Sequence, residues 1–204
     1  MQKVALLSTR GLPARYGAFE QTVYKLVEAN LHSEQPVHYF VGTDLKLQDE
    51  EFDADYCTRI YAQRASGAGV ILYGLLTTLA CCFRGCKTFV YFGYTMAPIF
   101  PILTLFGYKV ICNVDGFEWR RAKWGHLAKS YFRFCEKICG ISNAYLVSDA
   151  ETIRRYYSII HSKSSTLIRY GAELYRSNGQ NVGEYFVVVM RMEPENNIRM
   201  IVEG

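Results

Sequence analysis

Short apolar runs alternate along this chain with longer segments of helical periodicity, and this alternation restricts the possible folds more than any other feature. Strands are expected at Lys3 to Ser8, Val37 to Val41, Thr88 to Phe92, Lys109 to Val114, Ala144 to Val147 and Ser165 to Ile168. Strands that alternate with helices form parallel sheets with helical crossovers. The sequence therefore predicts an α/β fold with a Rossmann-like, doubly wound parallel sheet.

Two of the expected helices have recognisable starts. One begins near Ala18, where Phe19, Val23 and Val27 recur at helical spacing. Another begins at Ser148-Asp-Ala-Glu151, which has the form of a capping box, and runs toward Ile160.

The hydrophobic pattern is lost between residues 175 and 184, where turn-forming residues gather. This predicts a linker after a first domain that covers residues 1–174. A strand over Tyr185 to Met190 and a helix with an apolar side from Ile198 to Val202 follow it. Because one strand and one helix cannot bury their own faces, residues 185–204 are interpreted as the truncated start of a second domain.

Two uncharged runs, Ala65 to Phe83 and Thr88 to Tyr108, approach the length that a bilayer requires. Pro98 and Pro101 favour a strand, a loop and a short helix in the second run. The first run is interpreted as a buried helix of the α/β layer. A transmembrane hairpin is the alternative for both.

A basic helix is predicted after residue 125. Between Arg120 and Lys137 there are six Lys or Arg residues and one acid, Glu136. One helical face would carry His126, Lys129, Arg133 and Lys137, and the opposite face Leu127, Tyr131, Phe134 and Ile138. The basic face is either a solvated surface or a contact with an anionic membrane or a phosphate-bearing partner. Without a nucleic-acid-binding motif, nucleic acid is not an expected partner.

The seven cysteines are an odd number in a chain without a secretory signal, so we expect reduced thiols in the cytoplasm. Their spacing lacks neighbouring histidines and does not predict a metal site.

A loop from Gly11 to Gly17 follows the first expected strand and opens onto a helix N-terminus. Backbone N–H groups and the positive end of the helix dipole can bind an anion there, and Arg10 and Arg15 would reinforce them. The alternative is that glycine serves only the steric needs of the turn. The loop lacks the G-x-G-x-x-G pattern, which disfavours a nicotinamide dehydrogenase.

The segment Asp115 to Trp124 directly follows the apolar run that ends at Val114. Ligands of open α/β sheets bind beyond the carboxyl ends of the strands. Asp115 and Glu118 are therefore the candidate catalytic carboxylates, with Trp119 and Trp124 as stacking faces. This combination suits a polyhydroxylated substrate.

Four segments in this order resemble the rhamnosyltransferase-type branch of glycosyltransferase family 4. They are Val4 to Glu20, Asp115 to Trp124, Tyr170-Gly-Ala172 and Arg191 to Ile198. The resemblance spans nearly the whole chain. It implies a GT-B architecture, in which two Rossmann-like domains hold the acceptor and the nucleotide-sugar. It also implies transfer that retains anomeric configuration and uses no metal or other cofactor.

The resemblance also assigns roles to residues. Asp115 stands where many relatives have a histidine, Arg191 matches a residue that grips the donor diphosphate, and Asn196 replaces a second basic residue. The implied or expected substrate-binding residues are Gly11, Arg15, Gly17, Trp119, Arg120, Lys123, Gly171, Arg191 and Asn196.

The expected function is that of a glycosyltransferase fragment that transfers a hexose or deoxyhexose, such as rhamnose, in cell-surface polysaccharide assembly. The donor would be a dTDP-, UDP- or GDP-sugar, and the acceptor a glycan or a polyprenyl-linked sugar. The expected location is the cytoplasm, with peripheral attachment to the inner face of the plasma membrane. The alternative is a catalytically inactive remnant that acts as a binding or assembly protein.

Overall fold

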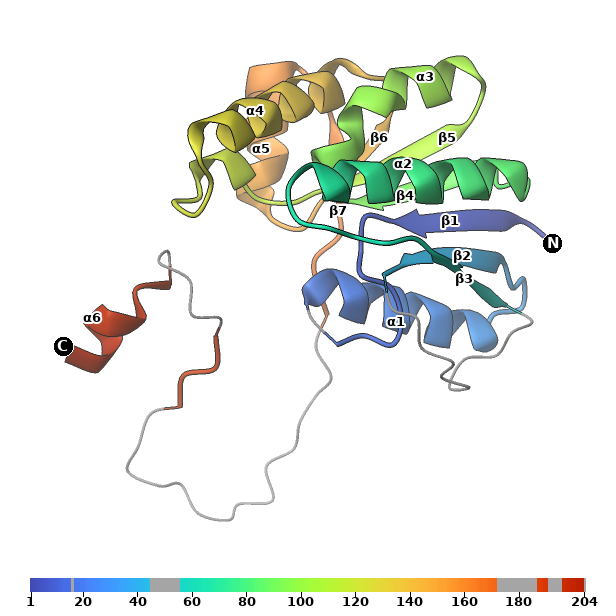
Figure 1. Ribbon diagram of the computed structural model, residues 1–204, viewed down its shortest axis with the longest axis horizontal. Helices are drawn as coiled ribbons and strands as arrows, with labels where there is room; N and C mark the ends of the chain where they lie inside the picture. Colours follow the sequence, from blue (N-terminus) through green and yellow to red (C-terminus); the bar gives the residue numbers. More distant parts are fainter. Residues whose placement is uncertain (16, 45–55, 172–186, 191–195, 204) are drawn as a thin grey trace, which may run out of the picture.

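The computed structural model describes residues 1–15, 17–44, 56–171, 187–190 and 196–203. Seven strands form one sheet in the order β3-β2-β1-β4-β5-β6-β7, and every pairing in it is parallel (Figure 1). This confirms the predicted Rossmann-like α/β fold. The strands are β1 Lys3–Leu7, β2 His38–Thr43, β3 Cys57–Tyr61, β4 Thr88–Phe92, β5 Lys109–Val114, β6 Tyr145–Ser148 and β7 Ser165–Leu167.

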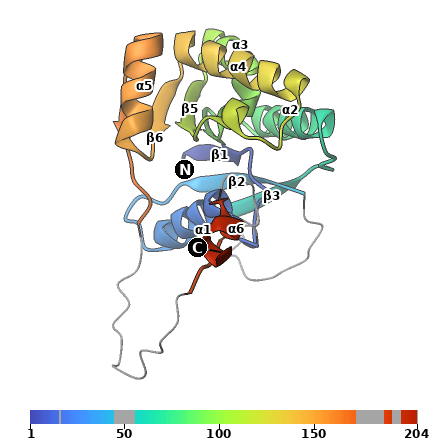
Figure 2. The same cartoon turned by 90° about the vertical axis from the view of Figure 1, so that its left-hand side faces the viewer.

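The helices divide unequally between the two faces of the sheet. They are α1 Ala18–Leu31, α2 Ala68–Phe83, α3 Phe100–Leu105, α4 His126–Ile141, α5 Glu151–His161 and α6 Ile198–Glu203, with 3-10 turns η1 Tyr94–Ile99 and η2 Glu118–Arg120. Figures 1 and 2 show α1 on one face and α2, α3, α4 and α5 on the other. Right-handed crossovers explain this division, because the chain moves one way from β1 to β2 and the opposite way from β3 to β7.

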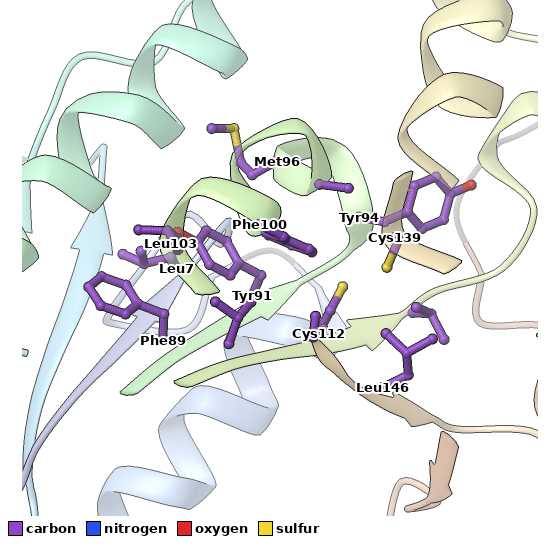
Figure 3. Close-up of a cluster of buried hydrophobic side chains, with 14 of the residues drawn as sticks. Leu7, Phe89, Tyr91, Tyr94, Met96, Phe100, Leu103, Cys112, Cys139 and Leu146 are labelled. Carbon is purple, nitrogen blue, oxygen red and sulfur yellow. The ribbon is translucent and has the colours of Figure 1, made fainter. Parts of the chain in front are cut away.

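The larger part of the core lies between the sheet and the layer of α2 to α5. Alternate residues of β5, Val110, Cys112 and Val114, are buried there. Figure 3 shows Tyr91 of β4 beside Phe100 of α3, and the two ring centroids are 4.9 Å apart. All seven cysteines are free, and six of them are buried.

One of the two end strands of the sheet was missing from the sequence-based prediction. Strand β3 was not predicted, because Thr58 and Arg59 stand side by side in it and break the alternation of buried and exposed residues. Among the described residues it pairs only with β2, at one end of the strand order.

The segment after the sheet was predicted only in part. Residues 187–190, the described part of the strand expected over 185–190, have no regular structure, so the prediction is wrong for them. A strand needs a neighbour to pair with, and the described sheet ends at β7. The helix expected from Ile198 is confirmed as α6, which buries none of its residues. The expected linker, residues 175–184, lies outside the described residues.

The two uncharged runs fold as parts of the α/β domain. Residues 88–108 form β4, η1 and α3, as predicted, and the first run forms α2. In the described part of the chain, no helix has the length and apolar character needed to cross a bilayer. The prediction that α2 is a buried helix is wrong for one side of it, since Leu72, Leu76 and Phe83 are exposed.

The basic helix is confirmed as α4, but its predicted apolar face is wrong by part of a turn. Leu127 is 90% exposed and Phe134 51%, whereas Phe132, Cys135 and Cys139 are buried. The buried face also includes Glu136, the one acid of the helix, because hydrogen-bond donors on neighbouring elements meet its carboxylate there.

The helix expected after Ser148 is confirmed as α5, but the predicted capping box is not formed. Ser148 is the last residue of β6, and its hydroxyl lies 2.6 Å from the hydroxyl of Ser165 in β7. Ala150 is the N-cap residue instead. The sheet pairing of β6 and β7 therefore takes the hydroxyl that the pattern assigned to the helix.

We expect Gly11→Ala to destabilise the fold by about 2 to 5 kcal/mol, because two costs combine at this position. Gly11 has a φ of +82°, and an added Cβ would lie 2.8 Å from the carbonyl oxygen of Gly42 and still closer to Thr43. The free energy of unfolding in urea measures the effect.

Gly85→Ala is the matched control. Gly85 has a φ of +80° but open space around it, so we expect a loss of only about 1 to 2 kcal/mol from the backbone conformation. Equal losses in the two variants would show that the contact with β2 contributes nothing.

Candidate functional site

Two of the predicted site residues follow strands of the sheet at its carboxyl edge. Gly11 lies in the loop after β1, and Asp115 directly follows β5. Because all strands run the same way, both lie at one edge, with β4 between their strands. Two strand spacings correspond to about 10 Å. The structure therefore places the two regions that the sequence analysis singled out on the same side of the domain.

Four side chains at or just beyond the ends of β5, β6 and β7 lie near one another at this edge. Asn113 lies at the end of β5, and its Nδ2 donates to the hydroxyl of Tyr170, 3.4 Å away, beyond β7. Asp115 and Asp149, which follow β5 and β6, are near enough for their charges to interact. The charges of both also act on Tyr170. We call Asn113, Asp115, Asp149 and Tyr170 the edge cluster.

Asp115 is mostly shielded from solvent, and its environment favours the protonated form. Burial raises the pKa of its carboxyl group above the usual 3.8, the Gly116 N–H opposes that shift, and the nearby charges of Glu118 and Asp149 add to it. The N–H of Gly116 donates to Oδ1 of Asp115 at 2.8 Å. A carboxyl group with a raised pKa is suited to exchanging a proton or a strong hydrogen bond with a hydroxyl group.

Asn113 carries an unsatisfied acceptor. Its Oδ1 is buried and has no hydrogen-bond partner among the described residues. A buried polar atom without a partner costs about 1 to 3 kcal/mol, so such atoms are usually satisfied by a ligand or water. The edge cluster therefore offers an acceptor for one more hydrogen-bond donor.

Tyr94, at the start of η1, fixes the backbone of the loop after β5. Its hydroxyl donates to the carbonyl oxygen of Gly116 at 3.3 Å and accepts from the N–H of Glu118 at 3.0 Å. The loop that carries Asp115 is thereby tied to the segment after β4.

Glu118, the second candidate carboxylate, is engaged on both oxygens. Oε1 pairs with the guanidinium group of Arg121 at 3.0 Å, and Oε2 accepts from the indole N–H of Trp124 at 2.9 Å. These contacts give Glu118 a role in shaping the loop, and they hold the Trp124 ring against Phe132 of α4.

Trp119 also packs against other side chains of the domain and does not form an open stacking surface. Its indole N–H donates to Glu136 Oε2 at 2.7 Å. The guanidinium groups of Arg120 and Arg133 lie 5.0 Å and 4.8 Å from its ring. Lys123 lies similarly over the ring of Trp124, 5.2 Å away. Each of the two tryptophans therefore packs against cationic side chains, in the segment that follows Asp115.

The glycine loop uses part of its hydrogen-bonding capacity internally. The N–H of Arg10 donates to Oε1 of the buried Glu20 at 2.8 Å, and the N–H of Gly11 to the hydroxyl of Thr9 at 3.1 Å. The hydroxyl of Tyr73 in α2 donates to the carbonyl oxygen of Thr9. These two N–H groups are therefore not the ones that would bind an anion, and the packing of Gly11 on β2 supports the steric alternative for this residue.

The remaining predicted site residues lie outside the edge cluster. Gly17 is the N-cap of α1, and Arg15 is exposed in the loop before it. Gly171 follows Tyr170 and is exposed. Asn196 lies two residues before the start of α6, which Figure 1 shows apart from the sheet. Arg191 lies outside the described residues. Within those residues, no three His, Cys, Asp or Glu side chains gather in a way that could hold a metal ion.

The family of this domain follows from its sequence. The model of DUF1972, a domain of unknown function, matches residues 1–173. The chain belongs to the DUF1972 family. DUF1972 is a domain found in glycosyltransferase-like proteins. No curated protein matches the chain. The match covers all seven strands of the sheet, so the edge cluster lies entirely within the DUF1972 domain.

Sequence reasoning missed three members of the edge cluster. Asp149 was assigned to a capping box, although it lies only two residues after the predicted strand that ends at Val147. Asn113 was a polar residue within an apolar strand, which is a signal for a functional position. Tyr170 was quoted only as part of a motif. In this DUF1972 domain the ends of β5, β6 and β7 carry the polar groups, and a systematic reading of the residues after each strand would have found them.

We expect Asp149→Asn to lower the pKa of Asp115, because it removes a negative charge that favours the protonated form. Carbon-detected NMR titration of the side-chain carboxyl groups measures this shift. Glu151→Gln, which removes a charge that pairs with Arg154 and Arg155 on α5, should leave Asp115 unchanged. An unchanged pKa in Asp149→Asn would show that the two carboxylates do not interact.

We also expect Asp115→Asn to raise the stability of the domain at neutral pH. The pKa of Asp115 is higher in the folded state than in the unfolded chain, so ionisation disfavours folding. The gain should therefore be present at neutral pH and disappear as the pH falls below the ordinary aspartate pKa, where both states are protonated. Urea unfolding at several pH values measures it, and a gain that persists in acid would contradict this origin.

Proposed function

We propose that this DUF1972 domain binds the acceptor of a retaining glycosyltransferase. The enzyme would transfer a hexose or deoxyhexose, such as rhamnose, from a nucleotide-sugar to a glycan or a polyprenyl-linked acceptor. The observation that carries the proposal is the edge cluster, in which two carboxylates, an amide and a phenol converge at the ligand-binding edge of a parallel sheet. The occurrence of DUF1972 in glycosyltransferase-like proteins supports the same reaction class.

The chemistry of the edge cluster suits sugar hydroxyl groups. Each hydroxyl both donates and accepts a hydrogen bond, and the cluster contains acceptors in Asp115, Asp149 and Asn113 Oδ1. A protein site built to hydrogen-bond hydroxyl groups also discriminates strongly against compounds without them. The polarity of the edge cluster therefore favours a sugar over an apolar ligand.

We assign Asp115 the central role in this site, with Glu118 as the residue that positions its loop. Asp115 has the raised pKa, whereas Glu118 is neutralised by Arg121 and held by Trp124. In the proposed reaction the bond from the sugar to the diphosphate breaks, a bond to the acceptor oxygen forms, and the proton of the acceptor hydroxyl group passes to the departing diphosphate. Asp115 accepts the hydrogen bond of the attacking hydroxyl group and thereby orients it.

The donor side of the proposal depends on groups away from the edge cluster. The positive N-terminal end of α1, reached by the loop from Gly11 to Gly17 with Arg15, would face the diphosphate. Arg191 and Asn196 would add a charge and a hydrogen bond. Arg120 and Lys123 would add positive charge beside the acceptor. We place the reaction in the cytoplasm, at the inner face of the plasma membrane, where a polyprenyl-linked acceptor would be presented.

A binding or assembly protein without catalytic activity is the second candidate. It is favoured by the internal use of the Arg10 and Gly11 N–H groups, which leaves the glycine loop fewer donors for a diphosphate. Such a protein would still bind a sugar at the edge cluster.

NMR titration and a transferase assay separate these functions. Methyl α-rhamnoside should perturb the amides of residues 113–116 and 149, and Asp115→Asn should weaken this binding by about tenfold or more, as expected for the loss of a charged hydrogen bond. Release of nucleoside diphosphate from dTDP-, UDP- or GDP-sugars in the presence of the glycoside would support the enzyme.

The control is Glu151→Gln, which changes the charge by the same amount outside the edge cluster and should bind like the wild type. Sugar binding without any release of nucleoside diphosphate favours the binding protein. If no sugar or nucleotide-sugar perturbs the edge cluster, both proposed functions are wrong.

A further inference from the structure

Helix α2 distributes its side chains in the reverse of the usual way: small and polar residues face the sheet, and apolar residues face outward. Its buried face carries Tyr73, Gly74, Thr77, Thr78 and Cys81. Its outer face carries a row of apolar side chains at helical spacing, Leu72, Leu76, Leu79 and Phe83. A helix on a sheet normally buries its apolar residues and exposes polar ones.

The buried face of α2 is stable because its hydroxyl groups are satisfied within the domain. Thr77 donates to the carbonyl oxygen of Tyr73 at 2.9 Å, and Thr78 donates to that of Gly74 at 2.7 Å. The close approach needs Gly74, since a Cβ there would overlap Met96 of η1. The tight packing fixes the rotation of α2, so the leucine row faces outward.

The outer side of α3 continues the apolar surface. Leu105 is 85% exposed, Phe106 74% and Ile102 56%, while Phe83 at the end of α2 is 89% exposed. The ends of the two helices lie together, because the hydroxyl of Tyr108 hydrogen-bonds the thiol of Cys82. We call Leu72, Leu76, Leu79, Phe83, Ile102, Leu105 and Phe106 the apolar patch. Several exposed apolar side chains gathered on one face of a folded domain indicate a binding partner.

Basic residues surround one end of the apolar patch. Arg84 and Lys87 follow α2, and Lys109 follows α3. Lys3, at the start of β1, reaches the same place, with its ammonium group 2.9 Å from the carbonyl oxygen of Arg84. All four side chains belong to exposed residues.

The same face of the domain exposes no acidic side chain on α2, α3 or α4. Residues 56–148 are all described and contain eleven Lys or Arg residues but only three acids. Of these, Asp115 lies at the sheet edge, Glu118 pairs with Arg121, and Glu136 is buried. The rest of the chain therefore has an excess of acids, and the positive charge of the protein is concentrated on this part.

We propose that the helical layer of α2, α3 and α4 docks on an anionic lipid bilayer, with the apolar patch inserted among the acyl chains. An exposed apolar row flanked by lysine and arginine, without acids, matches the two attractions that hold a protein at such a surface. Helix α2 lies in the plane of the interface. The basic residues of α4, with Leu127 and Phe134 exposed between them, extend the contact.

Sedimentation of the whole chain with vesicles tests this inference. We expect binding to phosphatidylcholine vesicles that contain phosphatidylglycerol, weaker binding to pure phosphatidylcholine, and a reduction at high salt. The triple variant Leu72→Gln/Leu76→Gln/Leu79→Gln should lose roughly tenfold or more of the binding to the anionic vesicles. Arg84→Gln/Lys87→Gln should bind more weakly and lose part of the salt dependence.

The matched control is Leu26→Gln/Leu31→Gln on α1, which changes exposed leucines on the opposite face and should bind like the wild type. If the triple variant does not fold, as judged by circular dichroism, Phe83→Gln/Phe106→Gln at the helix ends replaces it. Wild-type binding by all folded patch variants would overturn the proposal. The proposal would also be overturned if the wild type bound no vesicles and light scattering showed it to be a dimer that the triple variant dissociates. The result does not depend on sugar transfer, since a chain that binds vesicles but no sugar still confirms the docking face.

Discussion

The parallel pairing of all seven strands is the constraint on which the rest of the structure depends. Parallel strands must be joined by crossovers, so helices have to cover the sheet and every strand must end at the same edge. The right-handedness of those crossovers places α2 to α5 on one face. The same constraint brings Gly11 and Asp115 to one edge although about a hundred residues separate them. The candidate site and the proposed docking face are both consequences of this topology.

The spacing of apolar residues along the sequence predicted the sheet well, because this spacing depends on which residues can be buried. The strands at Thr88 to Phe92 and Lys109 to Val114 match the sequence-based prediction residue for residue. Contacts with partners far along the chain were harder to predict. Ser148 resembles a helix cap locally but bonds to Ser165 of the next strand, and Glu136 resembles a surface acid but is buried against Trp119 and Tyr156. Such residues satisfy a polar partner that no local pattern reveals.

The candidate site was likewise predicted from the sequence only in part. The sequence located the edge through Asp115, because a carboxylate after an apolar strand has a fixed position in a parallel sheet. It did not distinguish Asp115 from Glu118, since both are acids in one short segment. The distinction depends on Arg121 and Trp124, which neutralise and hold Glu118, and on Asp149, which adds to the raised pKa of Asp115. The environment set by neighbouring elements thus gives similar side chains different chemistry.

The orientation of α2 connects the site to the docking face. This helix begins near the carboxyl edge of the sheet, where Tyr73 bonds the loop after β1, and ends at the opposite edge with Phe83 and Arg84. A bilayer that contacts the whole leucine row would therefore lie along the helical layer and reach the edge of the sheet that carries the edge cluster. In this geometry the lipid-linked sugar of the proposed function would approach Asp115 along the membrane plane. The buried threonines of α2, whose hydroxyl groups are satisfied by carbonyl groups of the same helix, allow the leucines to face outward.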